Sequence, residues 1–463
     1  WNPSLDKEPW SGKMGEINEK LPMGEQCLED QRMFLPKIVD LITEGAASRD
    51  WYGRMRRGVH ALKNYIDMKH SVPSLARVVV IKCLYDTVTQ EFDHLDQYQI
   101  KVFAQVASIL LKCKECLPRL ILPWRPLYDY MHRLFFGKSR TSQTPLCRNL
   151  GYYLVALAKE GRRYFPDGCN DEILAELRPF FCPQDMSILK AQGFLCLLMR
   201  RHPSGFAEGG DGAMAFVREA MAYWSWIVSY SDWDLHWVTL LSSLCRHMHR
   251  DYADAWEPMI PNIMGHVLHI LDLPVGPSKV HIYDSKDSSI GSSDGYPFFT
   301  LSIFVHRGRT KVIQLVRKAA KLIVCLLRPG GGGGAMALVR RLAKAVESFL
   351  HPSNDGYWTR RLSQLLASLC EYLYLRVLRE KREVGGEDRL GPREVEEFAV
   401  VMLPLALQGL YSKSATAAMQ ASSALRHLSF LAPATVLPPL LDRVYPALTT
   451  LTQVHQTSSA LDA

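Results

Sequence analysis

Residues 392–431 read PREVEEFAVVMLPLALQGLYSKSATAAMQASSALRHLSFL and contain two helical patterns in succession. In the first, Val395, Phe398, Met402 and Leu405 recur at spacings of three and four, so they form one apolar stripe on a helix. The second is rich in alanine, which lets neighbouring helices approach closely. A proline inside the first helix and small residues in the second are typical of a HEAT-type repeat.

The same pattern continues towards the end of the chain. The pieces LPLAL at Leu403 and LPPLL at Leu437 begin 34 residues apart. The sequence therefore predicts one helix from Pro392 to Tyr411, a second from Ser414 to Phe430 and a third that begins around Thr435. Leucine or isoleucine followed by proline also occurs earlier at irregular separations, so we expect divergent repeats interrupted by loops.

Apolar stripes of helical period recur along most of the chain. They cover residues 31–41, 72–92, 97–114, 148–159, 186–199, 213–228, 235–249, 256–271, 311–327, 335–350 and 359–378. The one strand candidate is PFFTLSIFV from Pro297, and we expect at most a short hairpin near Phe298. A single bundle core stops growing well before this length. We therefore predict an all-α, HEAT/ARM-like helical-repeat α-solenoid with loop insertions.

Composition narrows the class of protein. Of 463 residues, 48% are hydrophobic and 22% are charged, which is typical of a globular chain. The mean hydropathy is −0.07, and the longest apolar run, AVVMLPLALQGLYS from Ala399, is too short to span a membrane. The net charge of +8 suits an acidic partner surface but does not by itself indicate nucleic-acid binding. We expect no membrane contact and no direct nucleic-acid binding.

Eleven scattered cysteines predict buried thiols in a reducing compartment. The pair Cys113 and Cys116 forms a single CxxC without a second pair at zinc-ribbon distance. The first thirty residues lack the apolar core of a secretory signal. Since the chain opens at Trp1 rather than methionine, we expect a fragment or a processed product.

Two groups resemble metal ligands but have the wrong spacing. Asp232, Asp234 and His236 are spaced by two, so on a helix they point in different directions. We interpret Asp232 as a helix N-cap, with Asp234 near the positive end of the same helix. In a further group, Cys245, His247 and His249, only the first and last share a face, and two ligands do not complete a site.

Four tryptophans stand close together, at Trp224, Trp226, Trp233 and Trp237. They are compatible with a cage for a cationic ligand or a stacking platform for bases. We favour core packing, because Trp233 and Trp237 are one helical turn apart. Five glycines follow Pro329, but no Gly-Lys-Ser/Thr follows them, so we expect a flexible linker rather than a phosphate-binding loop.

Basic residues cluster on several predicted helices. Pairs or triplets occur at 54–57, 162–163, 200–201, 317–321 and 340–344. Each is compatible with a solvated helix face, whereas stacking in a solenoid would merge several into one basic surface. The candidate basic surface comprises Arg317, Lys318, Lys321, Arg340, Arg341 and Lys344. We expect the first three to lie on a surface left exposed by stacking. We predict no catalytic, cofactor-binding or metal-binding residue.

Six stretches, taken in order, resemble the large HEAT-repeat proteasome activators, known as proteasome activator complex subunit four and, in yeast, as the bleomycin-sensitivity protein. They are LPWRPLYDYM from Leu122, LRPFFCPQDMSILKAQGFLCLLM from Leu177, WDLHWVTLLSSLCRH from Trp233, WEPMIPNIMGHVLHILDLPVG from Trp256, FLHPSNDGYWTRRLSQLL from Phe349 and LPPLLDRVYPALTTL from Leu437. The resemblance implies N-terminal HEAT-like repeats at 31–300, the start of the middle region at 310–463, and a poorly defined segment at 1–30.

The resemblance also implies a function. Family members are non-catalytic caps on the α ring of the proteasome core particle, and they promote ubiquitin- and ATP-independent degradation of peptides and unfolded proteins. Some bind inositol polyphosphates, and some bind acetylated histones through later regions. Nuclear and cytoplasmic localisation and a role in DNA repair are implied as well. The chain ends TSSALDA, without the family's docking tail. The alternative is a HEAT-repeat scaffold or nuclear-transport receptor that binds folded partners.

Overall fold

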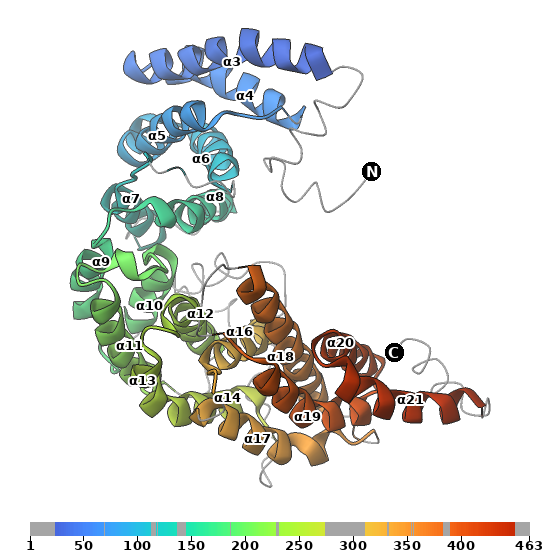
Figure 1. Ribbon diagram of the computed structural model, residues 1–463. Coiled ribbons are helices and arrows are strands. Elements are labelled where there is room, and N and C mark those ends of the chain that lie inside the picture. The colour runs from blue at the N-terminus through green and yellow to red at the C-terminus, as the bar shows by residue number, and fades with distance from the viewer. Residues whose placement is uncertain are drawn as a thin grey trace. The chain divides into compact units, whose positions relative to one another are not determined.

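The computed structural model describes residues 24–449 except for 69, 113–116, 118, 137–144, 186, 228–230, 274–310, 331–332, 353, 355 and 383–388. The described residues are mostly helical and contain no strand (Figure 1), which confirms the prediction of an all-α solenoid. The hairpin expected near Phe298 and the domain boundary expected between 300 and 310 lie outside the described residues.

The described residues form two compact units. Unit 1 comprises residues 24–200 and 205–207, and unit 2 comprises residues 201–204 and 208–449. No helix in either unit, as far as the structure describes them, is long and apolar enough to cross a membrane.

Unit 1 consists of two rows of helices. The helices are α3 (Gly24–Ala47), α4 (Arg56–Asp67), α5 (Ser74–Gln90), α6 (Gln97–Leu111), α7 (Trp124–Phe136), α8 (Pro145–Gly161), α9 (Cys169–Leu177) and α10 (Ser187–Leu198). One row contains α3, α5 and α7, and the other contains α4, α6, α8 and α10. A π-helical turn, Trp51–Met55, precedes α4, and the Asp50 carboxylate caps it by accepting from the Gly53 and Arg54 amides at 2.8 and 2.9 Å.

Unit 2 repeats the arrangement. Its helices are α11 (Gly210–Trp224), α12 (Ser231–Met248), α13 (Ala253–Trp256), α14 (Ile260–Leu271), α16 (Lys311–Leu326), α17 (Gly334–Val346), α18 (Tyr357–Arg382), α19 (Pro392–Gly409), α20 (Ala415–Leu431) and α21 (Pro433–Thr449). The first row contains α12, α16, α18 and α20, and the second contains α14, α17, α19 and α21. The helices expected from Pro392, Ser414 and Thr435 are α19, α20 and α21.

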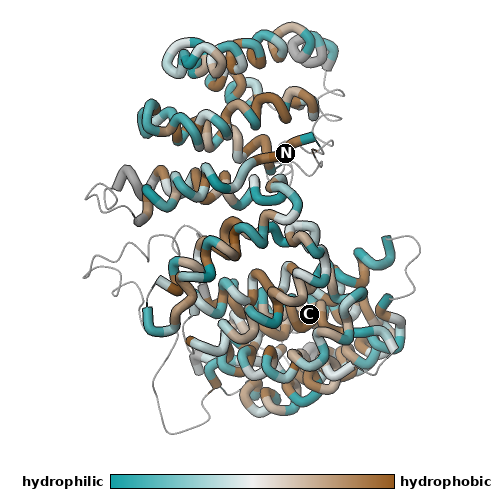
Figure 2. Tube along the Cα trace, turned by 90° about the vertical axis from the view of Figure 1, so that its left-hand side faces the viewer, coloured by the Kyte–Doolittle hydropathy of each residue, from teal (hydrophilic) through white to brown (hydrophobic). Residues whose placement is uncertain are grey.

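Several helices turn an apolar stripe towards the core, whereas α10 and most of α12 are buried on all sides. In α19, Val395, Phe398, Met402 and Leu405 are all buried, as their spacing predicts. Figure 2 shows hydrophobic and hydrophilic residues alternating along single helices, as one-sided stripes do. Because each stripe is covered by the helices beside it, the core runs along the stack of helices in each unit.

The alanine-rich helix α20 lies very close to α19. A Cβ atom added to Gly409 would meet the Ala421 Cβ at 3.1 Å, which is tighter than ordinary packing allows. Pro404 lies inside α19, and Pro438, Pro439 and Pro446 lie inside α21. The combination of an internal proline in one helix and small residues in the next is therefore present as the sequence predicts.

This close approach leads to a prediction about stability. We expect Gly409→Leu to lower the free energy of unfolding by about 1–3 kcal/mol, because the new side chain must displace α20. The matched control is Gly265→Leu in α14, an exposed helical position where an added Cβ has no neighbour within 4 Å. Denaturant unfolding followed by circular dichroism measures both variants. Equal stability of the two would contradict the close α19–α20 contact.

Candidate functional site

The α16 part of the predicted basic surface lies beside α18. Arg317, Lys318 and Lys321 are all half-buried rather than fully exposed, and none lies in the core. The Arg317 guanidinium pairs with the Glu371 carboxylate of α18 at 3.0 Å and lies 5.7 Å from the centre of the Tyr372 ring. The expectation of a surface left exposed by stacking is therefore only partly met, because α18 covers this side of α16.

The α17 part of the predicted basic surface lies in the other row. Arg340, Arg341 and Lys344 are exposed, and Arg340 forms an ion pair with Glu397 of α19. Since α16 and α17 belong to different rows of unit 2, the structure does not bring the six residues onto one row.

A different set of cations gathers around Lys321, towards the ends of α12 and α18. We call it the cationic cluster, and it comprises Arg201, His202, Arg246, His247, Lys321 and Arg379. The rings of His202 and His247 meet edge to face with centroids 4.9 Å apart. Arg246 and both histidines are exposed, so one side of the cluster faces solvent. All six residues belong to unit 2.

The surroundings of the cationic cluster disfavour the protonated forms of Lys321 and His247. Burial lowers the pKa of Lys321, and Arg246, Arg201 and Arg379 lower it further. Although part of the His247 ring reaches solvent, burial of the rest lowers its pKa, and the neighbouring cations add to this effect. A negatively charged ligand would relieve this repulsion, so the arrangement is suited to binding an anion.

A buried ion network lies next to the cationic cluster. The Arg376 side chain, 3% exposed, pairs with Glu380 at 2.7 Å and donates to the carbonyl oxygens of Val324, Cys325 and Leu327 at 2.5, 3.3 and 2.9 Å. These carbonyls belong to the last turn of α16 and the residue after it, where no intrahelical donor remains. Arg376 therefore caps α16 from α18.

Glu380 completes the network from the other side. Its carboxylate accepts from the Leu390 amide at 3.1 Å and lies 3.7 Å from the Arg250 guanidinium. Burial alone would raise the pKa of Glu380, but Arg376, the Leu390 amide and Arg250 outweigh it, so the pKa is lowered and the group stays ionised. The network joins α18, the end of α16 and the segment after α12.

The tryptophan group is mostly core, as the sequence predicts. Trp224, Trp233 and Trp237 are fully buried. The Trp224 indole N–H donates to the Asp234 carboxylate at 2.7 Å, and the Trp233 indole N–H donates to the Trp224 carbonyl at 3.1 Å. Trp226 is the exception. It is 42% exposed because α11 ends at Trp224 and Trp226 lies in the turn that follows.

The residues considered as metal ligands do not converge. The interpretation of Asp232 as an N-cap is wrong, because α12 already begins at Ser231 and Asp232 lies in its first turn. His249 follows α12, and its Nδ1 lies 3.1 Å from the Cys245 carbonyl oxygen of that helix, whereas His247 packs on His202. Among the residues that the structure describes, no three His, Cys, Asp or Glu side chains are placed to hold a metal ion.

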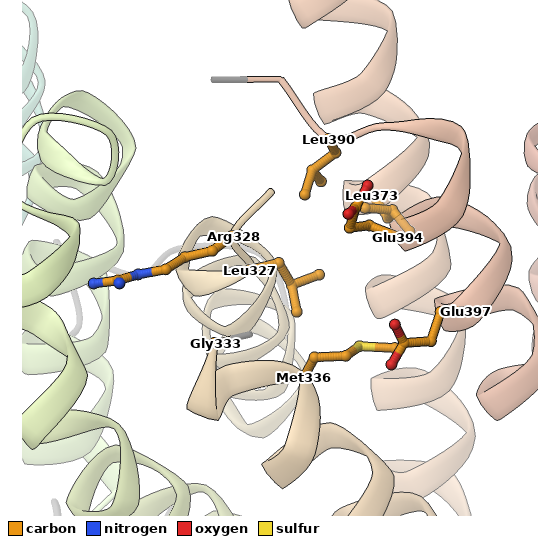
Figure 3. A pocket seen from close by; sticks show the side chains of 8 residues that line it. All are labelled: Leu327, Arg328, Gly333, Met336, Leu373, Leu390, Glu394 and Glu397. Atoms are coloured by element: carbon orange, nitrogen blue, oxygen red, sulfur yellow. The ribbon is translucent and has the colours of Figure 1, made fainter. Parts of the chain in front are cut away.

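The glycine run is held at both ends. The Gly330 amide donates to Glu394 at 3.0 Å, and the Gly334 amide donates to Glu257 at 2.5 Å. Between α16, α17, α18 and α19 lies a small pocket. Figure 3 shows Leu327 and Leu390 pointing into it, whereas Arg328 points away.

The polar residues of this pocket already have partners. Arg328 pairs with Asp254 at 2.9 Å, Glu394 accepts from Gly330, and Glu397 pairs with Arg340. We therefore interpret the pocket as a gap in helix packing rather than a ligand site.

One arginine from each of two other predicted basic clusters has a structural role in unit 1. Arg162 donates to the carbonyl oxygens of Cys196 and Leu197 at 3.0 and 3.2 Å, and so caps α10. Arg200 donates to the Phe165 carbonyl at 2.9 Å and pairs with Asp167 at 2.6 Å. Arg376 does for α16 what Arg162 does for α10.

Sequence reasoning missed three members of the cationic cluster, which are His202, Arg246 and Arg379. Each of the two arginines occupies the last turn or turns of a long helix, where cations interact favourably with the helix dipole. This position near the C-terminus of a helix was the signal in the sequence that could have identified both arginines. The sequence does not reveal the contact between α12, α16 and α18 that brings the cations together, because that contact joins residues that lie far apart in the sequence.

The capping network leads to a prediction about stability. We expect Arg376→Leu to lower the free energy of unfolding by about 3–5 kcal/mol, because Glu380 is then left buried without its partner. The double variant Arg376→Leu/Glu380→Leu should lose less. The control Arg340→Leu breaks an exposed pair and should cost under about 1 kcal/mol. Urea unfolding measures all three, and an Arg376→Leu variant as stable as the control would rule out the capping role.

Comparison with known proteins agrees with the resemblance in the sequence. Residues 339–463 match the model of the mid HEAT repeats region of proteasome activator complex subunit 4. The match covers α18 to α21, which include the repeat with which the sequence analysis begins.

Curated relatives match a larger part of the chain. Proteasome activator complex subunit 4 of Xenopus laevis is 30% identical over 400 residues, or 83% of this chain and 20% of the relative. The Homo sapiens protein of the same name is 30% identical over 404 residues, with the same shares. Proteasome activator subunit 4 of Arabidopsis thaliana is 27% identical over 349 residues, or 74% of this chain and 18% of the relative. The chain spans about a fifth of the length of these relatives, and it belongs to the proteasome activator complex subunit 4 family.

Proposed function

We propose that this chain forms part of a non-catalytic proteasome activator that caps the α ring of the core particle. The complete protein would promote ubiquitin- and ATP-independent degradation of peptides and of unfolded or acetylated proteins. The observation that supports this proposal most is the family match over 83% of the chain to relatives named as proteasome activators. The two-row helical units are consistent with it, since such stacks present long surfaces to a partner.

The finer parts of the proposal follow from the family resemblance. We propose a role in DNA repair and a location in both nucleus and cytoplasm, with any binding of acetylated histones carried by other regions of the complete protein. A HEAT-repeat scaffold or nuclear-transport receptor would share the same helical rows. Capture of the core particle by the complete protein therefore distinguishes the two functions, because a transport receptor or scaffold has no reason to bind the α ring.

We predict that the complete protein stimulates turnover of a fluorogenic peptide by purified core particle, whereas the 463-residue chain alone does not. A gate opens only when a ligand binds the open state better than the closed state. A chain that spans about a fifth of its relatives offers only part of their contact surface. Peptide turnover with and without excess chain is the measurement. Stimulation by the chain equal to that of the complete protein would place gate opening within these residues and contradict the prediction.

We further propose that the cationic cluster binds an inositol polyphosphate. Three guanidinium groups and a half-buried lysine lie together there, on a side that is open to solvent. Burial lowers the pKa of Lys321 and the neighbouring guanidinium groups lower it further, so a polyanion would be bound by charges that the fold has already brought together. Arginine and lysine are the side chains best suited to phosphate oxygens.

Titration calorimetry with inositol hexakisphosphate tests this proposal on the 463-residue chain. We expect the variant Lys321→Gln/Arg246→Gln to bind at least about tenfold more weakly, because two charges of the cationic cluster are removed. The matched control is Arg340→Gln/Arg341→Gln, which removes two exposed charges from α17. Equal weakening by both variants would indicate only a general charge effect and would overturn the assignment.

A further inference from the structure

Cations and aromatic rings alternate across three neighbouring helices of unit 1. We call them the cation–ring ladder, and it comprises Arg56 and His60 of α4, Tyr98 and Lys101 of α6, and Tyr153 of α8. The Arg56 guanidinium lies 5.7 Å from the centre of the Tyr98 ring, and the His60 ring stacks on Tyr98 with centroids 6.4 Å apart. The Lys101 ammonium lies 5.4 Å from the centre of the Tyr153 ring. The ladder therefore runs from α4 across α6 to α8.

The spacing along each helix places these residues on one face. Arg56 and His60 are four residues apart and Tyr98 and Lys101 are three apart, so each pair lies one turn apart on the same side of its helix. Gln105 follows one further turn along α6 and is half-buried. Since α4 contacts α6 and α6 contacts α8 within one row (Figure 1), the faces adjoin.

The cation–ring ladder is open to solvent. Tyr98 is 49% exposed, Arg56 is exposed, and His60, Lys101 and Tyr153 are half-buried. In the part of the chain that the structure describes, neither Arg56 nor Lys101 pairs with a carboxylate. Their positive charges are therefore available to a partner.

The two rows of unit 1 differ in charge. Together, the sequences of α4 and α6 contain a single carboxylate, Asp67, at the last residue of α4. Glu160 of α8 is already paired with Arg163 at 2.9 Å. In the opposite row, α3 alone contains five acidic residues, which are Glu25, Glu29, Asp30, Asp40 and Glu44. A partner that complements the row of the ladder is therefore acidic.

The contacts within the ladder favour a peptide over a nucleic acid. A base that stacked on Tyr98 would have to displace Arg56 or His60, which already lie against that ring. A carboxylate needs no such displacement, because it can pair with Arg56 or Lys101 where each already lies. The edge of an exposed tyrosine ring accepts another aromatic side chain, and the Gln105 amide can bond to a peptide backbone.

We propose that the cation–ring ladder binds an acidic stretch of an unfolded polypeptide that also contains aromatic residues. Glutamate or aspartate side chains of that stretch pair with Arg56 and Lys101, and an aromatic side chain packs against Tyr98. The proposal rests on the function proposed above, in which unfolded proteins are substrates. It adds a place on this chain where a substrate segment is held, and a preference for acidic sequence.

Fluorescence anisotropy of labelled peptides tests the preference on the 463-residue chain. The probe is a short peptide of Glu-Glu-Phe repeats. One comparison peptide has lysine in place of glutamate, and another has serine in place of phenylalanine. We expect the probe to bind at least about tenfold more tightly than either, because it alone offers both carboxylates and rings. Equal binding of all three peptides would overturn the proposal.

Variants test the place of binding. We expect Arg56→Gln/Lys101→Gln to weaken binding of the probe at least about tenfold. Tyr98→Ala should also weaken it, whereas Tyr98→Phe keeps the ring and should bind as the wild type does. The matched control Arg340→Gln/Arg341→Gln removes two exposed charges from α17 and should have no effect. Equal weakening by this control would indicate a general charge effect and overturn the assignment.

A cross-link on the wild-type chain decides the matter even where a variant fails to fold. A carbodiimide joins a carboxylate to a lysine amine in contact with it, so peptide mapping should find the probe on Lys101. Coupling at Lys321 instead would place the probe in the cationic cluster and overturn the proposal. Tighter binding of a labelled single-stranded DNA, lost in Arg56→Gln/Lys101→Gln, would overturn it as well.

These assays contain no core particle, so their outcome is separate from that of the proposed function. Failure of the chain to bind the probe contradicts the assignment of the cation–ring ladder. Failure of the complete protein to stimulate peptide turnover contradicts the proposed function.

Discussion

The packing of unit 2 depends on supplying hydrogen-bond donors to the carbonyl groups at the C-terminal end of α16. The last carbonyl groups of a helix have no partner within it, and in a stacked solenoid that end is covered by the next helix rather than by water. Arg376 of α18 meets this requirement with hydrogen bonds to three carbonyl oxygens, and Glu380 balances its charge. A buried arginine in this position requires a buried carboxylate to balance its charge. The Glu380 carboxylate is in turn stabilised by a hydrogen bond from the Leu390 amide and by the nearby Arg250 guanidinium. One helix end thus fixes the relative positions of α12, α16 and α18.

The positions of these three helices explain the chemistry gathered beside them. The same contact places Lys321 near the guanidinium groups of Arg246 and Arg379. The cationic cluster is not recognisable within a single helix. Its members come from α12, α16, α18 and the segment that follows α10. In a helical-repeat protein, the residues of a site therefore come from neighbouring helices of the stack rather than from one continuous stretch of sequence.

The fold could be predicted from the sequence because its signals are local. The stripe of Val395, Phe398 and Met402 depends only on the period of a helix, and the close approach of α20 depends only on its small residues. Three helices, α4, α7 and α9, were not among the predicted helices. In α9, nine residues are too few for a clear stripe. Which helices touch is not a local property. The sequence therefore placed Arg317 on a surface left exposed, whereas α18 covers part of it.

Whether a capping arginine comes before or after the helix that it caps affects how the chain folds during synthesis. Arg162 precedes α10, so the donor for the Cys196 and Leu197 carbonyls is already present when α10 is made. Arg376 follows α16 by about fifty residues, so the end of α16 must wait for most of α18. In unit 1, the C-terminal end of α10 can be capped as soon as α10 is synthesised. In unit 2, the carbonyl groups at the C-terminal end of α16 have no capping arginine until most of α18 is synthesised. That interval is when the apolar stripe of α16 is accessible to a chaperone.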